Sequence, residues 1–154
     1  SGYANAGQVC ISAQRIITSG EVYVDFLDAL KAGVEAITTG DPLNESVRMG
    51  PMVREEDATR VDQWIKEAVS AGARTLVGGE YSGTMYAPTV VADVKPEMRV
   101  SCEELFGPAV AVTPFSDIGE AIEMANSTNY GLSAGIFTQN IDWAMRFARE
   151  VESG

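Results

Sequence analysis

The 154-residue sequence contains no histidine, and this absence excludes several kinds of catalytic site. A Cys–His dyad or a Ser–His–Asp triad needs a histidine base, so neither can form within this chain. Histidine is also the commonest metal ligand, and two cysteines alone make no ordinary structural zinc site. The sequence therefore predicts no metal site and argues against a cysteine hydrolase.

Long apolar runs are missing as well. No run approaches the length of a membrane span, and the N-terminus has no basic flank before an apolar stretch. The two cysteines, Cys10 and Cys102, come without an export signal, so we expect free thiols in a reducing, cytoplasmic compartment. A disulfide between them is possible from the sequence, but we do not expect one.

Basic residues are scarce relative to acidic ones. Eleven Lys and Arg face 22 Asp and Glu, which gives a net charge of −11. An acidic surface does not attract nucleic acid or an anionic membrane, so we expect neither as a partner. With 45% hydrophobic and 21% charged residues, the composition is that of an ordinary globular protein. By length, residues 1–154 are expected to form a single domain.

Strand-like and helix-like segments alternate along the chain. Apolar residues recur at helical spacing in residues 21–37 and 55–71, and capping residues Asp117 and Asn140 precede two further helices. Strands are predicted at 13–18, 74–77, 86–94, 108–115 and 134–138. This alternation predicts an α/β fold, an open and mostly parallel twisted sheet with helices on both faces.

The stretch from Asn5 to Cys10 is the most informative part of the chain. A cysteine acts as a nucleophile only as the thiolate, and its surroundings control how much thiolate is present. Gly7 lacks a side chain, so a ligand could approach the backbone beside Cys10 closely. Free cysteines are more often small buried hydrophobic residues, and on spacing alone we favour that interpretation.

Three blocks together resemble one enzyme family. Tyr3-x-Asn5-x-Gly7-Gln8-x-Cys10, followed by Arg15, is similar to the catalytic-cysteine motif of the NAD(P)-dependent aldehyde dehydrogenase superfamily. Glu104-Leu105-Phe106-Gly107-Pro108 resembles its cofactor motif, and Asn129 to Thr138 resembles a third block. The resemblance covers the whole chain, but the chain covers only part of a family member, namely most of its catalytic domain.

The resemblance implies a role for three residues. Cys10 would attack a small aldehyde as thiolate, giving a thiohemiacetal and, after hydride loss to NAD or NADP, a thioester that is hydrolysed to a carboxylic acid. Glu104 would accept hydrogen bonds from the nicotinamide ribose, and Phe106 would pack beside the nicotinamide ring. Arg60 is a weaker candidate, because a polar residue near that position can reach the cofactor in related enzymes.

The resemblance also implies parts that these residues do not supply. We expect the nucleotide-binding domain, the glutamate that activates water, the oxyanion asparagine and a C-terminal oligomerisation segment to lie outside residues 1–154. The chain alone is thus expected to be inactive, and the intact enzyme to be a homo-oligomer, a dimer or a tetramer. The run from Cys10 to Arg15 resembles enzymes of small hydroxyaldehydes and semialdehydes. The alternative is a non-enzymatic interaction or structural protein that retains the fold.

Overall fold

The computed structural model describes residues 1–153. Its α-helices are α1 (Tyr23–Glu35), α2 (Glu55–Ser70), α3 (Arg99–Cys102), α4 (Ile118–Asn126) and α5 (Ile141–Glu150), with 3₁₀ helices at Ala4–Gly7 and Gly20–Val22. Its strands are β1 (Arg15–Ser19), β2 (Arg74–Val77), β3 (Tyr81–Ser82), β4 (Met85–Tyr86), β5 (Thr89–Ala92) and β6 (Ala109–Phe115).

Four of the strands form one open sheet in the order β1-β6-β5-β2. The central strand β6 pairs in parallel with β1 on one side and with β5 on the other, with Arg15 opposite Ala111 and Thr89 opposite Ala109. Strand β2 adds to the far edge in the antiparallel sense. The predicted open, mostly parallel α/β sheet is therefore confirmed.

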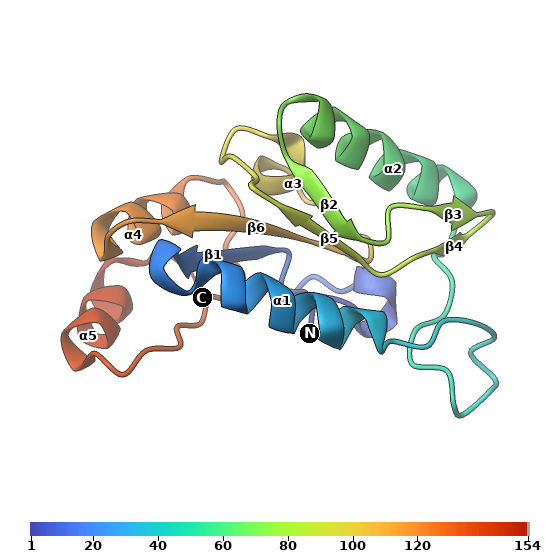
Figure 1. Cartoon of the computed structure of the whole chain (residues 1–154), viewed down its shortest axis with the longest axis horizontal. Coiled ribbons are helices and arrows are strands. Elements are labelled where there is room, and N and C mark those ends of the chain that lie inside the picture. Colours follow the sequence, from blue (N-terminus) through green and yellow to red (C-terminus); the bar gives the residue numbers. More distant parts are fainter. Residues whose placement is uncertain (154) are drawn as a thin grey trace.

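Helices α1 and α2 cover opposite faces of this sheet (Figure 1). Successive strand side chains point to opposite faces, and the apolar residues of β5 and β6 divide in that way. One apolar cluster contains Leu27, Val34, Val90, Ala92, Val110 and Val112. The other contains Val61, Trp64, Ile65, Val91, Ala109 and Ala111 among its members. Burying one such large side chain contributes about 1.5–3 kcal/mol, so both helices are held by the sheet.

Local signals explain where the helices begin and end. The Asp117 carboxylate accepts hydrogen bonds from the first backbone N–H groups of α4, and the Asn140 side chain does the same for α5. Helix α2 ends at Ser70, and Gly72 follows with φ +107°, a left-handed conformation that glycine adopts without steric cost. The predicted 55–71 helix is thus confirmed to within one residue.

Two predicted strands differ from the structure. Residues 134–138 form no strand, and within residues 1–153 no strand pairs with this segment. A strand needs a neighbour for its backbone N–H and C=O groups, and sequence pattern alone does not supply one. The predicted 86–94 strand is divided, because Pro88 interrupts it between β4 and β5 and Asp93 ends it with φ +57°.

Candidate active site

The loop before Cys10 has an unusual backbone. Asn5, Ala6 and Gly7 have φ values of +50°, +54° and +71°, and two of these residues carry a side chain that disfavours the left-handed region. Such conformations cost about 1–3 kcal/mol each and persist where the surroundings fix them. Here Ala6 is buried, and the Gln8 side chain donates to Asn5 O at 3.0 Å and accepts from Val53 N at 2.9 Å.

Cys10 itself is exposed and forms no disulfide. The interpretation favoured from spacing alone, a buried hydrophobic cysteine, is therefore wrong. Cys10 lies within a turn of residues 9–12, which is closed by Ser12 N donating to Val9 O at 2.9 Å. By contrast, Cys102 is partly buried at the end of α3, and its thiol donates to Glu97 O at 3.6 Å. Cys10 is thus the more accessible thiol.

Gly7 joins the cysteine loop to the second motif. A Cβ at Gly7 would lie 2.0 Å from Gly107 O and 2.4 Å from its carbonyl carbon. The missing side chain therefore permits close approach of the Gly107 backbone, whereas we expected it to admit a ligand. The structure thus brings the Cys10 loop and the turn after Phe106 into direct contact, although almost a hundred residues separate them in sequence.

The segment from Glu104 to Gly107 alternates between exposed and buried residues. Leu105 is 1% exposed and Phe106 is 40% exposed, while Glu104 lies at the surface. Phe106 has φ +48°, a conformation that is rare for a bulky residue. An accessible carboxylate with two acceptor oxygens and an accessible aromatic ring, side by side on one turn, fit the ribose and ring of a nicotinamide cofactor.

Two side chains that hold this segment were not predicted in that role. Gln14 donates from Nε2 to Val100 O at 3.0 Å and Glu103 O at 2.7 Å, and its Oε1 accepts from Leu105 N at 2.8 Å. Arg60 donates to Leu105 O at 2.7 Å. The only sequence signal for Gln14 was a polar residue inside a predicted buried strand.

Arg15, the last residue of the cysteine block, has a structural role. Its guanidinium donates to Met124 O at 2.7 Å and Ala125 O at 2.8 Å, at the C-terminal end of α4. Carbonyls of the last helical turn have no N–H partner four residues on within the helix. Here Met124 O also accepts from the N–H and the hydroxyl of Ser127, at 3.2 and 2.7 Å, and a cation at this end complements the helix dipole. Burial lowers the pKa of Arg15 from its ordinary value. Arg15 therefore ties β1 to α4.

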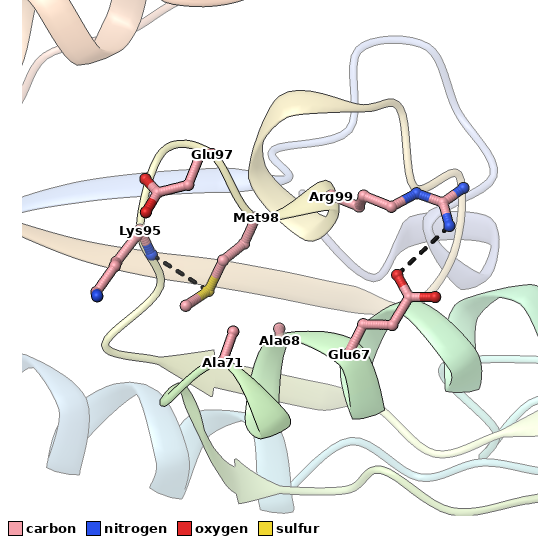
Figure 2. Close-up of a pocket in the computed structure, with 7 residues that line it drawn as sticks. All are labelled: Glu67, Ala68, Ala71, Lys95, Glu97, Met98 and Arg99. Carbon is pink, nitrogen blue, oxygen red and sulfur yellow. Dashed lines mark hydrogen bonds and ion pairs between the residues drawn. The ribbon is translucent and has the colours of Figure 1, made fainter.

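Two pockets lie elsewhere on the molecule. One, of about 220 Å³, lies between α2 and the segment before and within α3, with Ala68 and Ala71 facing Met98 (Figure 2). The other, of about 310 Å³, is lined by residues of 125–131 with Glu152 and Ser153. Neither contains Cys10, Glu104 or Phe106. Within residues 1–153 no group of three or more Cys, Asp or Glu is placed to hold a metal, and no helix there is long and apolar enough to cross a membrane.

The comparisons with known proteins agree with this geometry. The model of the aldehyde dehydrogenase family matches residues 1–154, so the chain belongs to that family. It is 44% identical to a 3-sulfolactaldehyde dehydrogenase of Priestia aryabhattai over 152 residues, covering 99% of this chain and 32% of that protein. The chain therefore spans about a third of the length of this relative.

Solved structures match this chain over nearly its whole length and over about a third of their own. The lactaldehyde dehydrogenase of Escherichia coli is 36% identical with a TM-score of 0.94, over 99% of this chain and 33% of that one. The aldehyde dehydrogenase of Mycobacterium tuberculosis in complex with NAD⁺ is 32% identical with a TM-score of 0.93, again over 99% and 33%. These neighbours confirm the predicted fold class.

Proposed function

We propose that this chain supplies the nucleophile and the nicotinamide end of the cofactor site in an enzyme that oxidises an aldehyde to a carboxylic acid. One observation carries the proposal: the exposed Cys10 lies on a loop whose Gly7 backbone contacts Gly107, directly beside the exposed Glu104 and Phe106 turn. Nucleophile and cofactor groups must lie near each other for hydride transfer from a covalent adduct. The family model matches residues 1–154, a range that includes both motifs, and this supports the proposal.

Cys10 would carry the covalent chemistry. Its thiolate attacks the aldehyde carbon and forms a thiohemiacetal, which becomes a thioester when the carbon is oxidised and is then released by water as the carboxylic acid. Covalent catalysis of this kind divides one difficult step into two easier ones. The oxyanion of the adduct requires hydrogen-bond donors, of which the backbone N–H of Cys10 is one.

Glu104 and Phe106 would hold the cofactor. The Glu104 carboxylate can accept from both hydroxyls of one ribose, and the Phe106 ring offers an apolar face. The cofactor, NAD or NADP, supplies a hydride acceptor when bound. The remaining parts, namely the adenosine site, the water-activating glutamate and the oxyanion asparagine, would lie in further residues of the intact enzyme. We propose that this enzyme is a cytoplasmic homo-oligomer acting on a small aldehyde, and that residues 1–154 alone are inactive.

Two substitutions in the intact enzyme test this assignment. Cys10→Ala should abolish both aldehyde oxidation and esterase activity, with a loss of about 10⁴-fold or more, while cofactor binding survives. Glu104→Gln should reduce oxidation by about a hundredfold, because a misplacement of about 1 Å can cost that much, and should spare esterase activity. Lactaldehyde and succinic semialdehyde are suitable first substrates.

Cys102→Ala is the matched control, because it removes a thiol from the same chain outside the proposed site. It should leave both activities near wild type. If Cys10→Ala kept oxidation activity, Cys10 would not be the nucleophile and its role would be withdrawn. If Glu104→Gln lost esterase and dehydrogenase activity equally, Glu104 would act in acyl chemistry or folding and its ribose role would be withdrawn.

A further inference from the structure

The side-chain amide of Gln14 holds three backbone groups, one in α3 and two in residues 103–107, which carry Glu104 and Phe106 and are called the cofactor turn below. Its two N–H donors bond Val100 O and Glu103 O, at 3.0 and 2.7 Å, and its oxygen accepts from Leu105 N at 2.8 Å. The orientation of the amide is fixed by these partners, because a flipped group would direct its oxygen at two carbonyl oxygens. We infer that Gln14 is a positioning residue for Glu104 and Phe106, an inference that rests on the function proposed above.

The peptide groups on both sides of Leu105 are held. Gln14 accepts from Leu105 N, and Arg60 donates to Leu105 O at 2.7 Å. The Leu105 side chain between them is 1% exposed. Glu104 and Phe106 are the direct neighbours of Leu105, so each shares a peptide group that is fixed by one of these bonds. Rotation of either side chain's backbone would break a buried hydrogen bond, which is costly.

Phe106 needs such support. Its φ of +48° is unfavourable for a residue with a bulky side chain, and a strained conformation persists only where its surroundings over-determine it. Arg60 fixes the peptide that links Leu105 to Phe106, and Val61 packs against Gly107 on the other side, 2.5 Å from a Cβ placed there. The backbone at Phe106 is therefore held on both sides, which fixes the position from which the ring projects.

The same amide links the cofactor turn to the nucleophile. Gln14 lies four residues after Cys10, and its backbone carbonyl accepts from Ala111 N at 2.8 Å, at the junction of β1 and β6. Its side chain thus connects the chain that leaves Cys10 to the turn that carries Glu104. A change at Gln14 should alter the position of the cofactor groups while leaving the exposed thiol in place.

Gln14→Met tests the inference, because it keeps the length of the side chain and removes all three hydrogen bonds. In the intact enzyme, hydrogen–deuterium exchange of the peptide containing Leu105 should become at least about tenfold faster. Oxidation should fall by about 10- to 100-fold, since a misplacement near 1 Å costs up to that much. Esterase activity at Cys10 should stay within about twofold, and KM for NAD or NADP should rise. A merely structural residue would lower both activities together.

Gln63→Met is the matched control, because Gln63 is an exposed glutamine of α2 that bonds only Glu67 in the same helix. It should change neither exchange at Leu105 nor the activity ratio. Gln14→Glu is a second variant in case Gln14→Met does not fold. It keeps the acceptor for Leu105 N and sets a carboxylate oxygen against the carbonyls of Val100 and Glu103. Protonation of that carboxylate removes the repulsion, so oxidation by the variant, expressed as a fraction of wild type at the same pH, should rise in acid.

The outcomes separate this inference from the proposed function. Faster exchange at Leu105 with an unchanged ratio of oxidation to esterase activity would overturn the positioning role and leave the roles of Cys10 and Glu104 intact. Unchanged exchange in Gln14→Met would show that the hydrogen bonds do not hold the turn. Failure of the proposed function would instead be seen in Cys10→Ala, independently of any change at Gln14.

Discussion

The cysteine loop and the C-terminal part of the chain carry comparable sequence motifs but differ in how they are held. The loop before Cys10 is fixed by the close approach of Gly7 to Gly107 and by the hydrogen bond from Val53 N to the Gln8 side chain. Residues 127–150 include a family-like block and a well-capped helix, yet α5 has no buried residue, and Phe137 is fully exposed. A motif therefore becomes a rigid site only where other parts of the same chain pack against it.

The difference follows from the range of the interactions involved. Helix α5 forms because its hydrogen bonds and its Asn140 cap lie within the helix. The predicted strand at 134–138 would need a partner strand, and within residues 1–153 none is supplied. The cysteine loop, in contrast, finds partners about 45 and 100 residues away, in Val53 and Gly107.

The largest expected effect is that of Gly7→Ala, which should remove the packing that holds the cysteine loop. A left-handed φ costs an L-residue about 1–2 kcal/mol, and overpacking against the Gly107 backbone costs about 1–3 kcal/mol more. We therefore expect the free energy of unfolding to fall by about 2–5 kcal/mol, measured by urea denaturation.

Gly33→Ala is the control for this substitution. Gly33 lies in α1 with nothing within 4 Å of a Cβ placed there. Alanine favours a helix over glycine, so the variant should be more stable by about 0.5–1 kcal/mol. Equal stability of the two alanine variants would mean that the Gly7–Gly107 contact is not maintained in solution.

The same distinction explains what could be predicted from the sequence. The apolar periodicity and Gly72 gave α2 to within one residue, and Asp117 and Asn140 gave the starts of α4 and α5. These signals are local. The short helix α3 and the β3–β4 hairpin carried no such signal and were not predicted.

For the site, motif order indicated Cys10, Glu104 and Phe106, whose functional roles stay predictions. It did not indicate what holds them. Gln14 bonds residues 86 to 91 positions away, and Arg60 bonds Leu105 across 45 positions. Hydrogen bonds over such distances depend on the folded arrangement of β1, α2 and the turn before β6, which no sequence pattern specifies.

Substitution of the two N-cap residues should have a smaller effect on the free energy of unfolding and should distinguish α4 from α5. Asp117→Ala should lower the free energy of unfolding by about 1 kcal/mol, because α4 buries Ile122 and is held by Arg15. Asn140→Ala should unfold α5 locally and change global stability by less than about 0.5 kcal/mol. Trp64 lies in α2 and Trp143 in α5. If one tryptophan is replaced by Phe, the fluorescence of the other follows the unfolding of its own helix, so local unfolding of α5 can be distinguished from global unfolding.

In Asn140→Ala, the unfolding transitions at Trp64 and Trp143 could instead coincide, with a loss in free energy of unfolding as large as that of Asp117→Ala. That result would contradict the local unfolding of α5. It would show that α5 unfolds together with the sheet. Such coupling would pass through the Phe115–Trp143 edge contact, with ring centroids 6.4 Å apart, and through the hydrogen bond from Asn126 Nδ2 to Glu150 O at 2.7 Å.

The smallest effect concerns pH and the link between α1, β2 and the end of β5. Tyr23 donates to Asp93 at 2.8 Å, and Arg74 donates to the same carboxylate. The Arg74 hydrogen bond holds the pKa of Asp93 below its ordinary value of 3.8, while burial and then the bond to Asp93 raise the pKa of Tyr23 to about 12. Both groups belong to the packed part of the molecule.

The pKa shifts of Asp93 and Tyr23 have opposite signs, so stability is lost in acid through Asp93 and in base through Tyr23. The folded-state pKa of Asp93 is depressed, so its contribution is present above pH 3.8 and is lost as pH falls through the lower folded value. The folded-state pKa of Tyr23 is raised, so its contribution is present below pH 10 and is lost between pH 10 and about 12. Asp93 is partly exposed, and solvent screening should keep the acid effect below about 1 kcal/mol.

Asp93→Asn tests the acid effect, with urea denaturation measured at several pH values. The variant should be less stable than wild type near neutral pH, and the difference should vanish in strong acid, where wild-type Asp93 is also uncharged. Glu150→Gln, which breaks the exposed Arg146–Glu150 pair within α5, serves as the control from the C-terminal part. It should leave global stability unchanged at every pH, because a pair inside a helix with no buried residue has little to stabilise beyond that helix. A constant difference between Asp93→Asn and wild type across the whole pH range would mean that the amide loses a neutral contact, and the ionic link between β2 and β5 would contribute nothing.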